Sequence, residues 1–222
     1  MRSFAAILMA VCVAAQAEPA APLRLAGTLT LGEGDLPNGA GATHRLALAL
    51  FAFRDTAWKP PAILQAARAA APLLAQCGVR LAGAELRELE GGEPELRDLF
   101  TPLARQLVRR LQPAKPAVFF VRDTRNRPGF EGEAFGRGNT RTRPELAGTV
   151  WLTEKTRDLP VALAHELAHV LMDSGDHAEE PGNLMREDTA PENTRLSPVQ
   201  CEQMRRNGTA NGWLKPAPPE LR

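Results

Sequence analysis

Three of the four histidines in this 222-residue chain lie within thirteen residues, at His165, His169 and His177. The run from His165 to His169 reads H-E-L-A-H, which is an H-E-x-x-H pattern. On an α-helix, residues four apart lie one turn apart on the same face, so both imidazoles can reach one metal ion. Glu166 can accept a proton from a water molecule bound to that metal. The pattern predicts a hydrolytic metal site, and zinc suits imidazole ligands with an open coordination position.

The residues around the pattern predict the helix that it needs. Asp158 and Pro160 form a helix start, alanine and leucine fill the following turns, and Gly175 supplies a stop. By chance, an H-E-x-x-H pattern would arise in roughly one of two hundred sequences of this composition. A metal site is therefore favoured over a pair of histidines on a helix surface.

A catalytic zinc site needs a third protein ligand besides the two histidines of the helix. His177 is the best candidate, because it lies eight residues after His169 and just beyond Gly175. A glycine can adopt the left-handed backbone conformation that turns the chain back toward the metal. Asp173 and Asp176 compete for the same role, since carboxylates also bind zinc.

This segment resembles the metzincin branch of the zinc metallopeptidases. The family signature is H-E-x-x-H-x-x-G-x-x-H followed by a methionine turn. Here the run from His165 reads H-E-L-A-H-V-L-M-D-S-G-D-H, and N-L-M follows at residues 183–185. By this resemblance Met185 is the methionine beneath the metal. The chain departs from the family at Met172, which stands where the family has glycine, and at the third histidine, which comes two residues later.

The resemblance implies an α+β, zincin-like fold with a mixed twisted sheet, an active-site helix and a C-terminal helix below the cleft. It also implies an endopeptidase that uses one zinc ion, held by the three histidines, and Glu166 as general base. In metzincins an edge strand above the cleft pairs with the backbone of the protein or peptide substrate. The segments Glu131–Gly136 and Ala147–Leu152 are the candidates for that strand.

Three other interpretations stay open at this point. In a gluzincin the third ligand is a glutamate on a later helix, which here would be Glu187 or Glu192. A non-catalytic or latent zinc-binding protein of the same fold is the second, although a purely structural site has no use for a base such as Glu166. The third is a secreted interaction module in which the H-E-x-x-H pattern is accidental.

Strands and helices are expected to alternate through the first two thirds of the chain. The leucines from residue 96 to residue 111 recur at helical spacing. Residues 122–147 are rich in arginine and glycine and predict a long loop with a short edge strand at Glu133–Phe135. Ser197 and Pro198 predict the start of a last helix. The expected strands are His44–Phe53, Val79–Leu89, Ala117–Val121 and Gly148–Thr153, and the other expected helices are Ala62–Gln76 and Leu96–Leu111.

The first 17 residues predict export. An apolar run follows one early arginine and ends in A-Q-A, the pattern of a signal peptide with its cleavage site. Residues 18–43 are expected to be a linker, a short pro-segment or a hairpin, residues 44–207 the catalytic domain, and residues 208–222 a loose tail. The mature protein is then expected in the periplasm or outside the cell, without a stable membrane anchor.

Cys77 and Cys201 are the two cysteines that stay after removal of the signal peptide, which contains Cys12. An exported chain meets an oxidising compartment, so a disulfide between them is favoured over two buried free thiols. Neither cysteine has a neighbour at metal-ligand spacing, so a thiolate zinc site is not expected.

The composition is that of an ordinary soluble domain, with 44% hydrophobic residues, 24% charged residues and a formal net charge of +1. A charge balance this even lacks the basic footprint of a protein that binds nucleic acid or an anionic membrane. We therefore expect no nucleic-acid partner, and we expect a monomer that meets a protein or peptide substrate.

Overall fold

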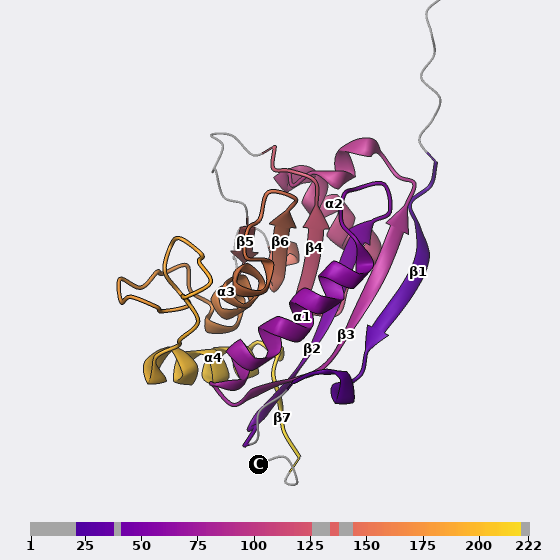
Figure 1. Cartoon of the computed structure of the whole chain (residues 1–222). Coiled ribbons are helices and arrows are strands. Elements are labelled where there is room, and N and C mark those ends of the chain that lie inside the picture. The colour runs from indigo at the N-terminus through magenta and orange to yellow at the C-terminus, as the bar shows by residue number, and fades with distance from the viewer. Residues whose placement is uncertain (1–20, 38–40, 126–133, 138–143, 219–222) are drawn as a thin grey trace, which may run out of the picture.

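The computed structural model describes residues 21–37, 41–125, 134–137 and 144–218 (Figure 1). Within these residues, seven strands form one sheet in the order β1-β3-β2-β4-β6-β5, with β7 paired to β2. Strands β3, β2, β4 and β6 run parallel, whereas β1 and β5 pair antiparallel at the two ends of the row. The strands are β1 (Arg24–Leu31), β2 (His44–Phe53), β3 (Val79–Glu90), β4 (Ala117–Val121), β5 (Ala134–Arg137), β6 (Thr149–Thr153) and β7 (Lys215–Pro216). The predicted α+β fold with a mixed twisted sheet is confirmed.

Helices cover both faces of the sheet in the described residues (Figure 1). Helices α1 and α3 lie on one face, and α2 lies on the other. Helix α4 packs against α3 on the side away from the sheet centre. The helices are α1 (Pro60–Ala75), α2 (Thr101–Leu111), α3 (Leu159–Met172) and α4 (Pro198–Ala210).

Two hydrophobic cores follow from the alternation of side chains along the central strands. Leu50 of β2 points to the core beneath α1 and α3, and its neighbour Phe51 points to the core beneath α2. On the α2 side, Phe51, Phe119 and Trp151 form a row across three strands, with ring centroids 5.0 and 4.3 Å apart. This row fixes the register of the strands that lead to α3, because aromatic pairs across strands stabilise a sheet.

Helix α3 is enclosed on all sides by the rest of the fold. Every residue from Val161 to Met172 is buried, including the polar ones. A helix that is apolar all round is one that lies in a core, and α3 is apolar except for its H-E-x-x-H residues. The two histidines of this helix therefore have little access to water.

The structure corrects three of the expected boundaries. Residues 18–43 are not only a linker, because β1 pairs with β3 in the sheet. The segment from residue 208 to residue 218 was expected to be part of a loose tail, but it is packed on the fold. Strand β7 pairs with β2, and both Leu214 and Ala217 are buried. The expected helix Leu96–Leu111 is split into a 3-10 turn, Pro94–Arg97, and α2, because the backbone of Leu99 bonds to Asp123 instead of continuing the helix.

A disulfide joins Cys77, just after α1, to Cys201 in the first turn of α4, as predicted. The two cysteines are 124 positions apart in the sequence, and both are buried. The bond therefore ties the first half of the chain to the helix beneath the histidines.

Removal of this bond is expected to destabilise the fold strongly. The paired substitutions Cys77→Ala and Cys201→Ala should lower the free energy of unfolding by about 2–4 kcal/mol, because the unfolded chain regains the entropy of a long open loop. Urea denaturation followed by circular dichroism measures the difference. A midpoint and slope equal to those of the oxidised wild type would contradict the expectation.

The described part of the chain contains no helix that is both long enough and apolar enough to cross a membrane. The predicted signal peptide, residues 1–17, lies outside the described residues.

Candidate metal centre

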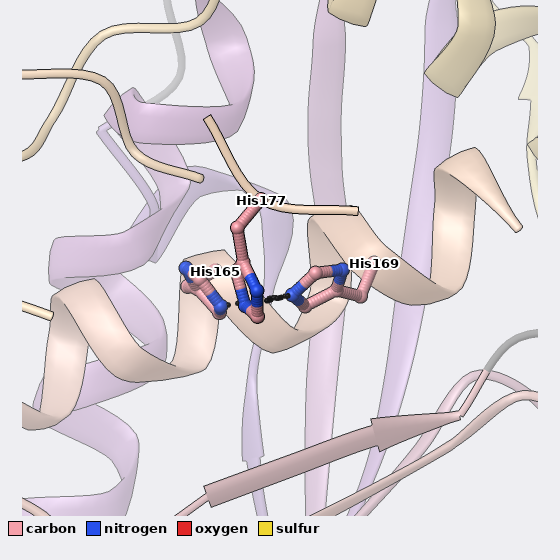
Figure 2. A group of neighbouring side chains, drawn as sticks. All are labelled: His165, His169 and His177. Atoms are coloured by element: carbon pink, nitrogen blue, oxygen red, sulfur yellow. Dashed lines mark hydrogen bonds between the residues drawn. The ribbon is translucent and has the colours of Figure 1, made fainter. Parts of the chain in front are cut away.

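Helix α3 brings His165 and His169 to one face, and the segment after the helix brings His177 to the same point (Figure 2). The Nε2 atom of His169 lies 2.9 Å from Nε2 of His165 and 3.2 Å from Nε2 of His177. The ligand atoms of the three rings all lie within 4.8 Å of one another. Three imidazole nitrogens that converge in this way can hold a metal ion.

The hydrogen bonds of the two helix histidines determine which nitrogen carries the proton. Nδ1 of His165 lies 2.7 Å from the carbonyl oxygen of Leu184, and Nδ1 of His169 lies 2.8 Å from that of Ser174. A carbonyl oxygen only accepts, so each Nδ1 donates. In the neutral rings, each Nε2 is then an unprotonated lone pair. Two such lone pairs facing each other cannot hydrogen-bond, but a cation between them satisfies both.

The burial of the two helix histidines keeps them neutral. His165 is 2% exposed and His169 is 6% exposed. Burial lowers the pKa of His165 below its ordinary value and lowers the pKa of His169 to about 4, since a charged imidazolium loses its hydration there. A neutral ring keeps its lone pair, and it is the neutral form of histidine that binds a metal.

The turn that brings in His177 begins earlier than the sequence indicated. Helix α3 ends at Met172, and its C-cap residue Asp173 has a left-handed backbone with φ of 51°. The N–H of Asp173 donates to the carbonyls of His169 and Val170. Gly175 is not among the residues with positive φ. Aspartate is one of the residues that tolerate the left-handed conformation, so the expected glycine turn is replaced by an aspartate turn.

The segment with Met185 bonds to the two chain segments that carry the histidine cluster. The carbonyl of Leu184 accepts from His165, and the carbonyl of Met185 accepts from the N–H of Ala178 at 2.7 Å, next to His177. Met185 itself is 1% exposed and belongs to the core beneath α3. Its side chain is therefore a buried one on a turn that bonds to His165 and to the residue after His177.

Glu166 follows His165 on α3 and is 7% exposed. This places a buried carboxyl group in the same helical turn as the first histidine, which is the position that the H-E-x-x-H pattern requires of a base.

The competing carboxylates are not part of the cluster. Among the described residues, the only group of three or more potential metal ligands is the histidine triplet. The carboxylate of Asp176 instead accepts from the hydroxyl of Ser174 at 2.8 Å. Asp173 ends the helix, and neither Glu187 nor Glu192 lies within the group.

Sequence reasoning missed the groups that orient the histidines. The two acceptors are the backbone carbonyls of Leu184 and Ser174, and a carbonyl gives no signal in a sequence because every residue carries one. Asn183, which is 7% exposed and accepts from the N–H of Met185, was also missed. A signal existed for Asn183, since asparagine often bonds to the backbone two residues further on.

Comparisons with known proteins agree with this architecture. No protein-family model matches the sequence, and no curated protein matches it either. Among solved structures, the chain is similar to metalloproteinase-II from Bacteroides fragilis, with a TM-score of 0.53 and 17% sequence identity. The match covers 76% of this chain and 54% of that one, so this chain spans about half the length of that protein. At this level of identity the likeness shows a shared fold.

Proposed function

We propose that the chain is a zinc-dependent endopeptidase. The observation that carries the proposal is the convergence of three Nε2 atoms, two of which belong to buried rings whose Nδ1 atoms already donate to carbonyls. In such an arrangement the Nε2 lone pairs face one another, and a bound cation would satisfy them. The similarity to a solved metalloproteinase supports the same conclusion.

Zinc fits the donor set better than other common ions. Neutral imidazoles suit zinc, and three protein ligands leave a fourth position open, as in catalytic zinc sites. Two nitrogens bound tetrahedrally at about 2.0–2.1 Å would lie about 3.4 Å apart. The Nε2 separations of 2.9 and 3.2 Å differ from this by a few tenths of an ångström, which small ring rotations can supply.

Zinc in this position would supply Lewis acidity, which lowers the pKa of water toward about 7 and polarises a peptide carbonyl. His165, His169 and His177 would hold the ion. Glu166 would accept the proton of the attacking water and deliver it to the leaving amine. The carbonyls of Leu184 and Ser174 would keep two of the rings in the binding orientation.

Strand β5 is the better of the two candidates to pair with a substrate backbone. It is the last strand of the row and lies beside α3. The other candidate, Ala147–Leu152, corresponds to β6, which has β4 on one side and β5 on the other. Because both of its edges are already paired, β6 has no edge to offer, and that expectation is wrong. The first candidate was Glu131–Gly136, and its residues from Glu131 to residue 133 lie outside the described residues.

We further propose the metzincin type of site, in an exported protein that acts as a monomer on protein or peptide substrates. His177 as third ligand and Met185 as the methionine of the turn support this type over a gluzincin. The disulfide between Cys77 and Cys201 supports an oxidising compartment, in which such bonds persist.

Metal removal tests the proposal directly. The purified protein should contain about one zinc ion per chain and should cleave members of a mixed peptide library. Dialysis against a chelator should abolish cleavage, and added zinc should restore it. The measurements are elemental analysis and mass spectrometry of the cleaved peptides. Cleavage that persists in the chelated protein would refute the role of the metal, and zinc without cleavage would favour a non-catalytic zinc protein.

A further inference from the structure

One short turn, residues 183–185, bonds to two segments of the chain that carry histidines of the candidate metal site. The carbonyl of Leu184 accepts from Nδ1 of His165, and the carbonyl of Met185 accepts from the N–H of Ala178. Ala178 is the residue after His177. The positions of two of the three histidines therefore depend on how firmly this turn is held.

The turn is fixed by a pair of side-chain amides. Oδ1 of Asn183 accepts from the N–H of Met185 at 2.9 Å and from Nε2 of Gln200 at 3.2 Å. In return, Nδ2 of Asn183 donates to Oε1 of Gln200 at 3.1 Å. Each amide thus satisfies the other, and Asn183 is buried, where an unpaired polar group would be costly.

Gln200 is itself rigidly placed. It lies in the first turn of α4, where its Oε1 accepts from the N–H of Ser197 at 2.8 Å and its own N–H donates to the Ser197 hydroxyl at 3.3 Å. The next residue, Cys201, is bonded to Cys77. The amide of Gln200 is therefore anchored by a helix cap on one side and by a disulfide on the other.

A second glutamine flanks the other cysteine of the disulfide. Gln76 donates from Nε2 to the carbonyl of Thr194 and accepts at Oε1 from the N–H of Leu196, both at 2.8 Å. The residue between them, Arg195, accepts at its carbonyl from the N–H of Leu184 at 2.6 Å. The segment beside the turn is thus held from the end of α1.

We infer that Gln200 is a positioning residue for the metal site, acting through Asn183 on the turn that supports His165 and His177, with Gln76 as its counterpart on the disulfide's other end. The inference rests on the metal site of the proposed function but not on peptide cleavage. Among the bonds of the described residues, those of the two glutamines reach Asn183 and the segment beside the turn, and none reaches a histidine, so each would act through the backbone of the turn.

The substitution Gln200→Ala tests this role in two measurements. Zinc affinity, measured by competition with a chromophoric chelator, is expected to fall about tenfold, the lower end of what the loss of an outer support costs a metal site. In the metal-free protein, exchange of the His165 Nδ1 proton, followed by NMR of labelled histidine rings, should become about tenfold faster. The NMR measurement needs neither zinc nor turnover.

Ser197→Ala is the matched control. It removes only the hydroxyl that accepts from the backbone N–H of Gln200. The backbone N–H of residue 197 still donates to Oε1 of Gln200, and the amide pair between Asn183 and Gln200 stays in place. This variant should lower the Tm, as the loss of a helix cap does, while zinc affinity and His165 exchange stay within about twofold of wild type. A positioning role and a merely structural one then give different results.

A second variant covers the case in which Gln200→Ala does not fold. Gln200→Glu keeps an oxygen for the N–H of Ser197 and for Nδ2 of Asn183, but it loses the donor to Oδ1 of Asn183. We expect it to fold and to show the same faster exchange at His165. In the double variant with Asn183→Ala, the effect of Gln200→Glu should vanish, because both act through one turn.

The inference is overturned if both Gln200 variants match Ser197→Ala in zinc affinity and in His165 exchange. It is overturned equally if the two effects of Gln200→Glu and Asn183→Ala simply add. A wild type that binds zinc but cleaves nothing would refute the proposed peptidase activity and would leave this inference standing. A wild type that binds no zinc would refute the metal site and this inference with it.

Discussion

Alanine in place of His169 is expected to abolish metal binding. Its Nε2 is the atom that lies close to both other rings, at 2.9 Å from His165 and 3.2 Å from His177. Its removal therefore takes away the central ligand of the three. Because the loss of an outer support alone costs about 10–100-fold in affinity, the loss of a ligand should cost well over a hundredfold. Zinc per chain after gel filtration should fall close to zero, and peptide cleavage should be lost with it.

His44→Ala is the matched control for this variant. His44 is the fourth histidine of the chain, lies at the start of β2 and is not part of the cluster. Its replacement should leave the zinc content and the cleavage unchanged. His177→Ala, which removes the exposed member of the triplet, should also weaken zinc binding. A His169→Ala protein that still holds stoichiometric zinc would show that the metal, if present, is bound elsewhere.

The sequence predicted the helix that carries His165 and His169 well because its determinants are local. The four-residue spacing of His165 and His169 has one meaning on a helix, and the expected start at Pro160 agrees with α3, which begins at Leu159. The start of α4 at Ser197 and Pro198 was predicted for the same reason, since the Ser197 side chain caps the helix by accepting from the N–H of Gln200 within one turn. Both are interactions between residues close in the sequence.

Strands β1 and β7 were not predicted, because they depend on distant partners. Strand β1 has mostly exposed side chains, so burial in the core does not hold it in place, and its pairing with β3 does. Strand β7 is two residues long and exists through its contact with β2. Composition alone made both segments resemble a linker and a tail.

The supports of the metal site lay beyond the sequence for a related reason. His165 is separated by 19 residues from the carbonyl that orients it, and Gln76 by 118 from the carbonyl of Thr194. The spacing of residues in the sequence does not predict such contacts. They arise only when α1, α3 and α4 are packed together, and the predicted disulfide was the one visible sign of that packing.

Glutamine in place of Glu166 is expected to remove activity while zinc stays bound. Glu166 is buried next to His165, and glutamine has nearly the same shape. The three imidazoles are untouched, so the zinc content should equal that of wild type. The amide cannot accept a proton at neutral pH, so kcat for peptide cleavage should fall by about 10²–10⁴-fold, the usual contribution of a general base.

Glu202→Gln is the control for this experiment, because it makes the same chemical change on an exposed position of α4. The Glu202 side chain is 71% exposed and lies 4.0 Å from Arg206, so its loss should alter neither zinc content nor kcat. If Glu166→Gln kept more than about a tenth of the wild-type kcat, another group would have to act as the base. If it lost its zinc instead, the carboxylate would belong to the support of the metal, because a base that only moves protons leaves the affinity of the site unchanged.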